Sequence, residues 1–184
     1  MSVQFKIKRK SIKQLEKFFS RREQLTILRN TLNTLGKTAH KEARQAVKER
    51  YNIKGAPGSG NQKIKGATNK KLSYQVFMKF NRESVMKYRG TKYKGRGKSR
   101  TVNVEIKKGS GKQISNAFIV RGDTRAAYKR RPGRQNKALV GMSWNIMYRN
   151  VALSSGGNVY GRIIKNKHAV VMKQQIKKLY AKVK

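Results

Sequence analysis

The sequence predicts an α+β protein, with a long N-terminal amphipathic helix, a central antiparallel β-sheet that carries extended basic loops, and a C-terminal helix. Apolar residues recur at helical spacing near both ends of the chain and alternate with polar residues in the middle. This order of helix, sheet and helix is typical of the α+β class. We expect one domain over residues 20–184, preceded by an arm and a short helix over residues 1–19.

The N-terminal arm contains an alternating segment and a helix start. Val3, Phe5 and Ile7 alternate with polar neighbours, which indicates a short strand or an extended arm. Ser11 stands three residues before Gln14, the spacing of a capping box, in which each side chain bonds the backbone of the other residue. A short helix is therefore expected after Ser11.

The segment from Ser20 to about Tyr51 has the clearest helical pattern. Ser20 and Glu23 repeat the capping-box spacing. Apolar residues then follow at three- and four-residue steps, namely Leu25, Leu28, Leu32, Leu35, Ala39, Ala43, Ala46 and Val47. The seam changes from leucine to alanine after Gly36, which predicts close packing in the second half. A coiled coil and a single helix packed on a sheet explain this pattern about equally well.

Two alternating segments predict strands in the middle of the chain. They run from Leu72 to Phe80 and from Val102 to Ile106. The segments Ile114–Val120 and Ala126–Tyr128 are weaker strand candidates. Residues 138–151 fit the helical and the strand period equally well, so their structure stays open.

The C-terminal segment has a helical pattern that runs to the end of the chain. Its apolar residues fall on one helical face and are Met172, Ile176, Leu179, Tyr180 and Val183. Lysines occupy the remaining positions of this helix. Between the patterned segments lie basic loops at about residues 55–71, 87–100 and 129–137, which are rich in glycine, asparagine, lysine and arginine. The first of them is expected to be a loop or a hairpin extension.

The net charge of the chain is its dominant property. Lys and Arg number 47 against 7 Asp and Glu, which gives a formal charge of +40. Self-repulsion of this size opposes compaction, so a stable state needs an acidic partner such as nucleic acid or an acidic protein. Cys is absent, which excludes disulfides and thiolate metal sites. No run approaches the roughly 20 apolar residues of a membrane span, and we expect a soluble protein with no membrane partner.

The acidic and imidazole side chains do not suggest an enzyme. Only Glu83, Glu105 and Asp123 lie in the central region, and His40 and His168 have no metal-ligand spacing. Many nearby cations depress the pKa of a carboxyl group, which is the wrong direction for a general acid near neutral pH. We expect no catalytic residue, no metal site and no cofactor. A nuclease is the least favoured hypothesis.

Two of the basic loops are candidate DNA contacts. In residues 87–100, Tyr88 and Tyr93 interleave with cations, and glycines keep the backbone pliable. Such segments can follow a phosphate backbone without distinguishing bases. The alternative is a solvated hairpin whose charges only confer solubility. The candidate polyanion-contacting residues are Lys87, Arg89, Lys92, Lys94, Arg96, Lys98, Arg100, Lys129, Arg130, Arg131 and Arg134.

Several segments together resemble the minor tail protein Z family, the tail completion proteins of long-tailed phages. The similar segments occur in the same order and are Leu32–Ala39, Tyr51–Lys54, the basic region before Val102–Ile106, Asn116–Ile119 and Tyr128–Arg130. The chain departs from the family pattern at Arg131–Arg134, where Arg-Pro-Gly-Arg replaces an expected Pro-Ile turn.

The resemblance implies a virion subunit of the head–tail neck, present in several copies around the tail axis. Its implied partners are other copies of itself in a ring, tail terminator or tail tube proteins, head-connector proteins and double-stranded DNA. The implied location is the tail or neck of the virion, and the host cytoplasm during assembly. The alternative is a ribosomal or other RNA-associated structural protein, which also combines basic loops with a small core.

The charge is larger than DNA alone can neutralise. About 30 Å of duplex presents only ~18 phosphate charges. A hypothetical ring of about six copies, each at +40, exceeds this several-fold. We therefore expect the basic loops to divide between DNA and acidic protein neighbours.

Overall fold

A computed structural model describes residues 2–5, 19–57, 61–94, 101–120, 126–153 and 158–183. It has helices and antiparallel sheets, so the predicted α+β class is confirmed. The chain divides into two compact units: a helical unit (Met1–Ala43, Gln62–Met78 and Ala152–Lys184) and a β unit (Arg44–Asn61 and Lys79–Val151). Because one long helix is shared by both units, the expectation of a single domain over residues 20–184 stays a prediction.

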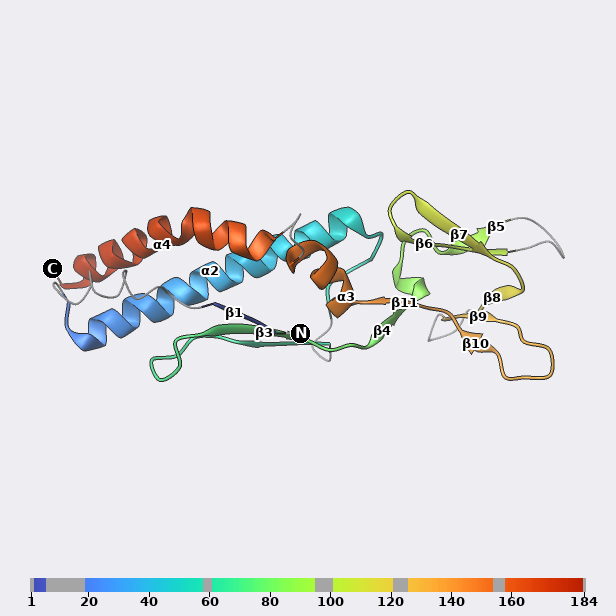
Figure 1. Cartoon of the computed structure of the whole chain (residues 1–184), viewed down its shortest axis with the longest axis horizontal. Helices are drawn as coiled ribbons and strands as arrows, with labels where there is room; N and C mark the ends of the chain where they lie inside the picture. Colours follow the sequence, from blue (N-terminus) through green and yellow to red (C-terminus); the bar gives the residue numbers. More distant parts are fainter. Residues whose placement is uncertain are drawn as a thin grey trace. The chain divides into compact units, whose positions relative to one another are not determined.

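The helical unit places two long helices over a three-stranded antiparallel sheet (Figure 1). The helices are α2 (Arg21–Arg50), of which residues 21–43 belong to this unit, and α4 (Val159–Val183). The strand order is β1-β3-β2, with bounds Ser2–Phe5, Tyr74–Met78 and Gln62–Lys65. A strand near the N-terminus is therefore confirmed, whereas the short helix expected after Ser11 falls within residues 6–18, outside the described residues.

The N-terminus of α2 is the predicted capping box. The backbone N–H of Ser20 donates to Oε2 of Glu23 over 2.9 Å, and the N–H of Glu23 donates to Oγ of Ser20 over 3.4 Å. The Ser20 hydroxyl also donates to the Glu23 carboxylate, and this bond is the main reason why the pKa of Glu23 is lowered. Two of the free N–H groups of the first turn are satisfied in this way.

The apolar seam of α2 packs on both α4 and the sheet. Ile27 and Leu28 are buried against Met172, Ile176 and Leu179 of α4. Further along, Ala39 and Ala43 have no exposed surface, and His40 Nδ1 lies 3.5 Å from the Tyr160 hydroxyl. The predicted close packing of the alanine half is confirmed.

Gly36 explains why the seam changes where it does. A Cβ atom at this position would lie 2.2 Å from Cδ1 of Tyr74 in β3, so only glycine lets the tyrosine ring reach the helix backbone. One turn earlier Asn33 bonds both backbone groups of Ala67, donating to its carbonyl over 3.1 Å and accepting from its N–H over 2.7 Å. These contacts show the helix packed on a sheet and its connections, as in the second of the two alternatives.

Residues 55–71, predicted as a loop or a hairpin extension, contain strand β2. β2 pairs with β3 in antiparallel register, Ile64 opposite Val76. The segment Gln62–Lys65 has a single apolar residue, which is too little for an alternating pattern. The strand forms because β3 offers an open edge, and that edge is not visible in the local sequence.

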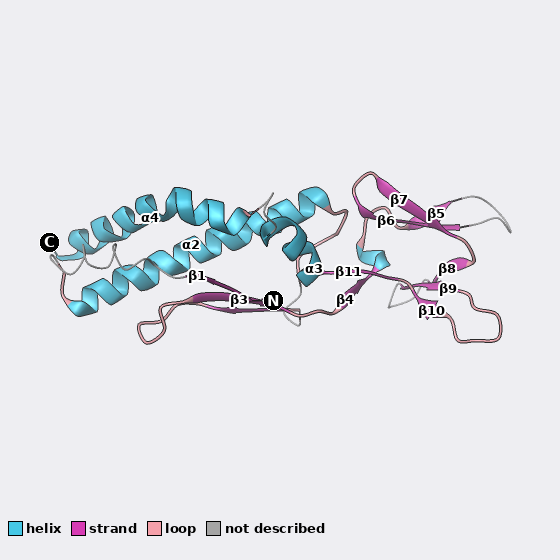
Figure 2. Ribbon diagram, viewed as in Figure 1, coloured by secondary structure: helices cyan, strands magenta, loops and turns pink. Residues whose placement is uncertain are grey.

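The β unit contains three small antiparallel sheets, seen beside short helices in Figure 2. One has the order β5-β6-β7, with bounds Lys92–Lys94, Thr101–Lys107 and Ser110–Ile114. A second has the order β10-β9-β8, with bounds Lys137–Ala138, Ala126–Lys129 and Ala117–Val120. The third pairs β11 (Val140–Ser143) with β4 (Arg82–Ser84). The short helices are a 3₁₀ turn η1 (Val85–Lys87), α3 (Trp144–Tyr148) and a π-helical turn η3 (Arg149–Leu153).

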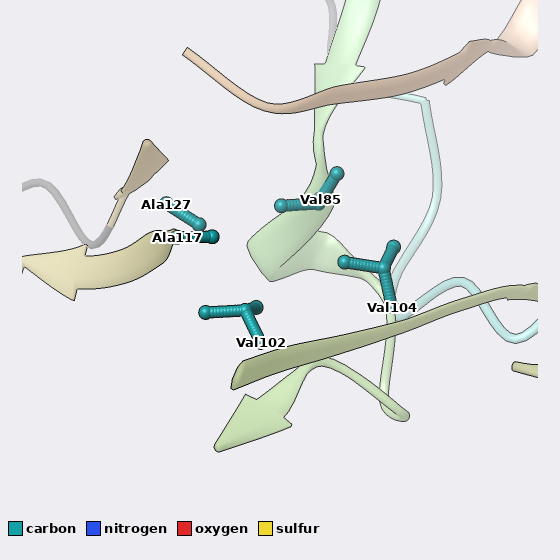
Figure 3. Packing of buried hydrophobic residues seen from close by; sticks show 5 residues of the cluster. All are labelled: Val85, Val102, Val104, Ala117 and Ala127. Atoms are coloured by element: carbon teal, nitrogen blue, oxygen red, sulfur yellow. The ribbon is translucent and has the colours of Figure 1, made fainter. Parts of the chain in front are cut away.

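The core of the β unit lies between the first two sheets. Its buried side chains point toward one another in Figure 3 and are Val85, Val102, Val104, Ala117 and Ala127. Tyr93, Ile114 and Ile119 pack around them. The inner faces of both sheets therefore share one small cluster of valine and alanine, and their outer faces lie on opposite sides of it.

The structure explains the sequence patterns of two further segments. The strand predicted over Ile114–Val120 is two strands, because Asn116 takes a left-handed φ of 53° and turns the chain between β7 and β8. Residues 138–151 fit both periods because β11 runs directly into α3. Ser143 makes this change, since its hydroxyl accepts from the N–H of Ile146 over 3.3 Å and caps the helix.

The exit of α2 is built into the β unit. Tyr51 and Ile53 are buried and form single bridges with Lys107 and Tyr88. The backbone N–H of Asn52 donates to Ile106 over 2.9 Å, and its carbonyl accepts from Arg89 over 2.8 Å. The segment after the helix therefore acts as a short strand between β6 and the residues that follow η1.

Candidate nucleic-acid interface

Few cations of the described chain are neutralised by carboxylates. Among the described residues the structure shows two ion pairs, Lys87 with Glu83 and Lys167 with Glu42 at 2.9 Å. Glu105 accepts from the N–H of Gly109 over 2.8 Å, so it serves a turn. With 47 Lys and Arg in the chain, most of the described positive charge is left for solvent or for partners.

The carboxylates singled out in the sequence do not form a site. Glu83 is buried, accepts from the amide of Asn61 over 2.8 Å and pairs with Lys87. Glu105 lies beside Gly90, where an added Cβ would be 2.4 Å from its own Cβ. Asp123 lies outside the described residues. Within the described part of the chain, no three His, Cys, Asp or Glu side chains gather in a way that could hold a metal.

The tyrosines of the first basic loop do not interleave with its cations as expected. Tyr88 has no exposed surface, and its hydroxyl donates to the carbonyl of Met142 over 3.0 Å and accepts from its N–H over 3.1 Å. Burial raises the pKa of Tyr88 to about 12. Tyr93 is half-buried, and its hydroxyl accepts from the N–H of Ile119 over 2.7 Å. Both rings are internal clamps and cannot stack on a ligand.

The described part of this loop is also more ordered than the sequence predicts. Lys87 ends η1, and its ammonium group is paired with Glu83. Lys92 and Lys94 belong to β5 and face outward on either side of the inward Tyr93, opposite Asn103 and Thr101 of β6. The remaining predicted contacts of this loop lie outside the described residues and are Arg96, Lys98 and Arg100.

Arg89 lines a small polar cavity with two other cations. The cavity has a volume of about 190 Å³ and is lined by Lys48, Arg89 and Lys108, together with Glu49 and Asn52. A space of this size with three cations around it suits an anionic group such as a phosphate oxygen cluster. Lys48 and Lys108 were not predicted as contacts, because the helix exit and the end of β6 meet only in the folded chain.

The second basic loop is the predicted turn, between β9 and β10. The N–H of Arg134 donates to the carbonyl of Arg131 over 3.2 Å, and Gly133 between them has a φ of 65°. A proline followed by a residue with positive φ is the pattern of a type II turn. Lys129, Arg130, Arg131 and Arg134 are all exposed.

Those predicted contacts that lie on or next to described strands belong to two surfaces. Lys92 and Lys94 lie on the outer face of β5-β6-β7, because Tyr93 between them packs on the core. Arg130 extends from the outer face of β10-β9-β8, where it lies over the Phe118 ring. These two faces lie on opposite sides of the shared core. One straight polyanion cannot lie flat on both faces of the same unit at once.

Comparison with known proteins gives no match to a family model, a curated protein or a solved structure. Neither α2 nor α4, nor any shorter helix among the described residues, has the length and apolar character needed to cross a bilayer.

Proposed function

We propose that this chain is a structural tail-completion protein of a tailed phage virion, which helps to join tail to head and contacts double-stranded DNA non-specifically. The observation that carries the proposal is the excess of exposed, unpaired cations on both units, without a clustered catalytic or base-specific arrangement among the described residues. Phosphate contacts made by such surfaces position a protein on DNA and carry no sequence information.

The resemblance to the minor tail protein Z family supports the location of the protein. Three residues of its motifs make specific contacts in this fold: Asn33 bonds the backbone of Ala67, Gly36 leaves room for the Tyr74 ring, and Tyr51 is buried at the helix exit. The resemblance therefore rests on residues that this fold uses. In this role the partners are other copies in a ring, tail terminator or tail tube proteins, and head-connector proteins.

The arrangement of cations supports a division of contacts. Helix α4 adds a third basic surface, with exposed cations at Arg162, Lys165, Lys167, Lys173, Lys177 and Lys178. Since a short stretch of duplex offers too few phosphates for several copies of a +40 chain, the remaining surfaces contact acidic neighbours. The opposite faces of the β unit allow one face to meet DNA while the other meets protein.

The direct test is to tag the chain in its native host, isolate the particle that contains it and image that particle by electron cryomicroscopy. The proposal predicts density for several copies around the axis at the head end of a tail, with basic surfaces toward DNA and toward acidic subunits. Recovery of the chain in a ribosome or another RNA-containing particle would instead establish the RNA-associated alternative. A particle in which all the Lys and Arg surfaces face bulk solvent would contradict the division of contacts.

A further inference from the structure

The outer face of the β10-β9-β8 sheet carries aromatic side chains beside a dense group of cations. Ala117 and Ala127 point into the core, so their neighbours along the strands, Phe118 and Tyr128, point outward. The register places Phe118 opposite Tyr128, and Tyr128 opposite Ala138. These three residues form one row across the sheet, which we call the aromatic face.

The two rings are already arranged for stacking. Their centroids are 5.8 Å apart with an angle of 26° between the ring planes. The guanidinium carbon of Arg130 lies 5.3 Å from the centroid of the Phe118 ring. Aromatic rings and planar guanidinium groups are the side chains on which proteins stack single bases, and the stacking tolerates any base because each has a π-face.

Small side chains leave room next to these rings. Ala138 and Ala126 flank Tyr128 across and along the sheet, and Val120 at the end of the face is 41% exposed. Tyr128 and Phe118 are half-buried and contact one another, and Arg130 lies over the Phe118 ring. A flat group can therefore approach Tyr128 from solvent, in contrast to the enclosed ring of Tyr88.

The charge around the aromatic face identifies the kind of ligand. Residues 126–140 contain five cations, Lys129, Arg130, Arg131, Arg134 and Lys137, and no acidic residue. The type II turn presents Arg131 and Arg134 just beyond the rings. A ligand that offers both flat π-faces and closely spaced negative charges is a nucleic acid strand. Bases in a duplex expose only their edges, so the faces needed for stacking are free only in a single strand.

We propose that the aromatic face binds unpaired bases of single-stranded nucleic acid. Bases stack on Tyr128 and Phe118, while Arg130, Arg131 and Arg134 contact the phosphates on either side. This activity is separate from the proposed place of the chain in a virion, because it requires only an unpaired segment. It differs from the duplex contacts above in that base faces, and not phosphates alone, contribute to binding.

The test uses fluorescence anisotropy with the full chain and a labelled oligothymidylate of about ten nucleotides, a length within the usual range of single-strand sites. An abasic strand of equal length offers the same phosphates without bases. We expect wild type to bind the oligothymidylate more tightly than the abasic strand. Tyr128→Ala should weaken the first by about five- to 150-fold, the value of one stacked base, and leave the second unchanged.

Two variants serve as controls. Tyr128→Phe keeps the ring and should retain tight binding of the oligothymidylate. Tyr180→Ala removes another exposed tyrosine, on α4, and should leave both affinities unchanged. The single tryptophan, Trp144, is buried in the β unit, so an unchanged emission spectrum shows that each variant is folded.

Equal affinity of wild type for the oligothymidylate and the abasic strand would overturn the proposal, as would unchanged binding by folded Tyr128→Ala. An oligouridylate arm distinguishes the source of the strand: with base stacking shown by the Tyr128→Ala loss, tighter binding of the oligouridylate points to RNA and tighter binding of the oligothymidylate points to DNA as the ligand. A failure of base stacking leaves the duplex contacts and the particle location to be tested separately, because neither depends on Tyr128.

Discussion

The helical unit and the β unit are stabilised by different means. In the helical unit a long seam of leucine and alanine packs along α4 and the sheet, and a glycine admits one tyrosine ring. The β unit has a cluster of small side chains between two of its sheets, Val85, Val102 and their neighbours. It also buries large rings, among them Tyr51, Tyr88 and Trp144, and the Tyr88 hydroxyl bonds the backbone of a distant strand. The difference shows how a chain of such high charge can fold: one unit relies on regular periodicity, and the other on a few large buried rings and their hydrogen bonds.

Tyrosine has opposite roles within the β unit. Tyr88 and Tyr93 belong to a basic loop by sequence, yet their hydroxyls bond backbone groups of distant strands. Tyr128, next to a second basic loop, points away from the core. The presence of tyrosine among cations therefore does not by itself identify a binding surface. Whether the side chain points into the core or toward solvent decides whether it can bind a ligand.

The largest effect is expected from removing the clamp at Tyr88. Tyr88→Ala deletes a fully buried ring and leaves the N–H and carbonyl of Met142 without their partner, and it should lower the free energy of unfolding by about 3–5 kcal/mol. Tyr128→Ala, at an outward and half-buried position, loses its ring pair with Phe118 and should lower it by only about 0.5–1.5 kcal/mol. Chemical denaturation of both variants measures this contrast, and equal losses would contradict the opposite roles of the two tyrosines.

The helical unit should be most sensitive at Gly36. Gly36→Ala gains up to about 1 kcal/mol of helix propensity, but the new methyl group would lie within the Tyr74 ring. We expect a net loss of about 1–3 kcal/mol in thermal or chemical denaturation, because the clash outweighs the propensity. Lys37→Ala, at the exposed neighbour, is the control and should be close to neutral. A stabilised Gly36→Ala protein would show that the ring can move aside.

The β unit should lose stability at high pH because of Tyr88. Its pKa is raised to about 12 in the folded state, from the ordinary tyrosine value of 10.0. A raised pKa contributes stability that is complete below pH 10 and is lost as the pH rises through about 12. The free energy of unfolding of wild type should fall over this interval, and Tyr88→Phe should show a smaller fall. Identical pH profiles would mean that Tyr88 does not titrate with unfolding.

The smallest effect is expected at the start of α2. The pKa of Glu23 is lowered, mainly by the hydrogen bond from the Ser20 hydroxyl, so its contribution to stability is present above the ordinary glutamate value of 4.5 and is lost as the pH falls. Glu23→Gln should flatten the acid side of the stability profile slightly, with little change at neutral pH. Far-ultraviolet circular dichroism between neutral and acid pH measures this, and a large loss at neutral pH would contradict it.

The sequence predicted the features that depend on local periodicity. Both long helices and the Ser20–Glu23 cap are as expected, because their patterns lie within one segment. It failed where the partner is distant in sequence. The bounds of β2 depend on its pairing with β3, and Lys92 and Lys94 become strand residues because β6 pairs with them. Whether a strand residue of the β unit points toward the core or toward solvent depends on such pairings.

The candidate contact residues could likewise be predicted only in part from the sequence. The basic composition identified the loops, and the type II turn at Arg131–Arg134 follows from its Pro-Gly step. The meeting of Arg89 with Lys48 and Lys108 in one cavity, and the alignment of Phe118 with Tyr128, need the folded chain. Neither could be found from spacing along the sequence.

The central claim, that exposed cations contact DNA without distinguishing its sequence, is tested most directly by the salt dependence of duplex binding. For two unrelated duplexes the affinity of the intact chain should fall linearly with the logarithm of salt concentration, with the same slope. Replacing Arg131 and Arg134 together by glutamine should reduce that slope by about 1.8, since each lost phosphate contact contributes about 0.9. An affinity that does not change with salt concentration, or that differs strongly between the two duplexes, would contradict the claim.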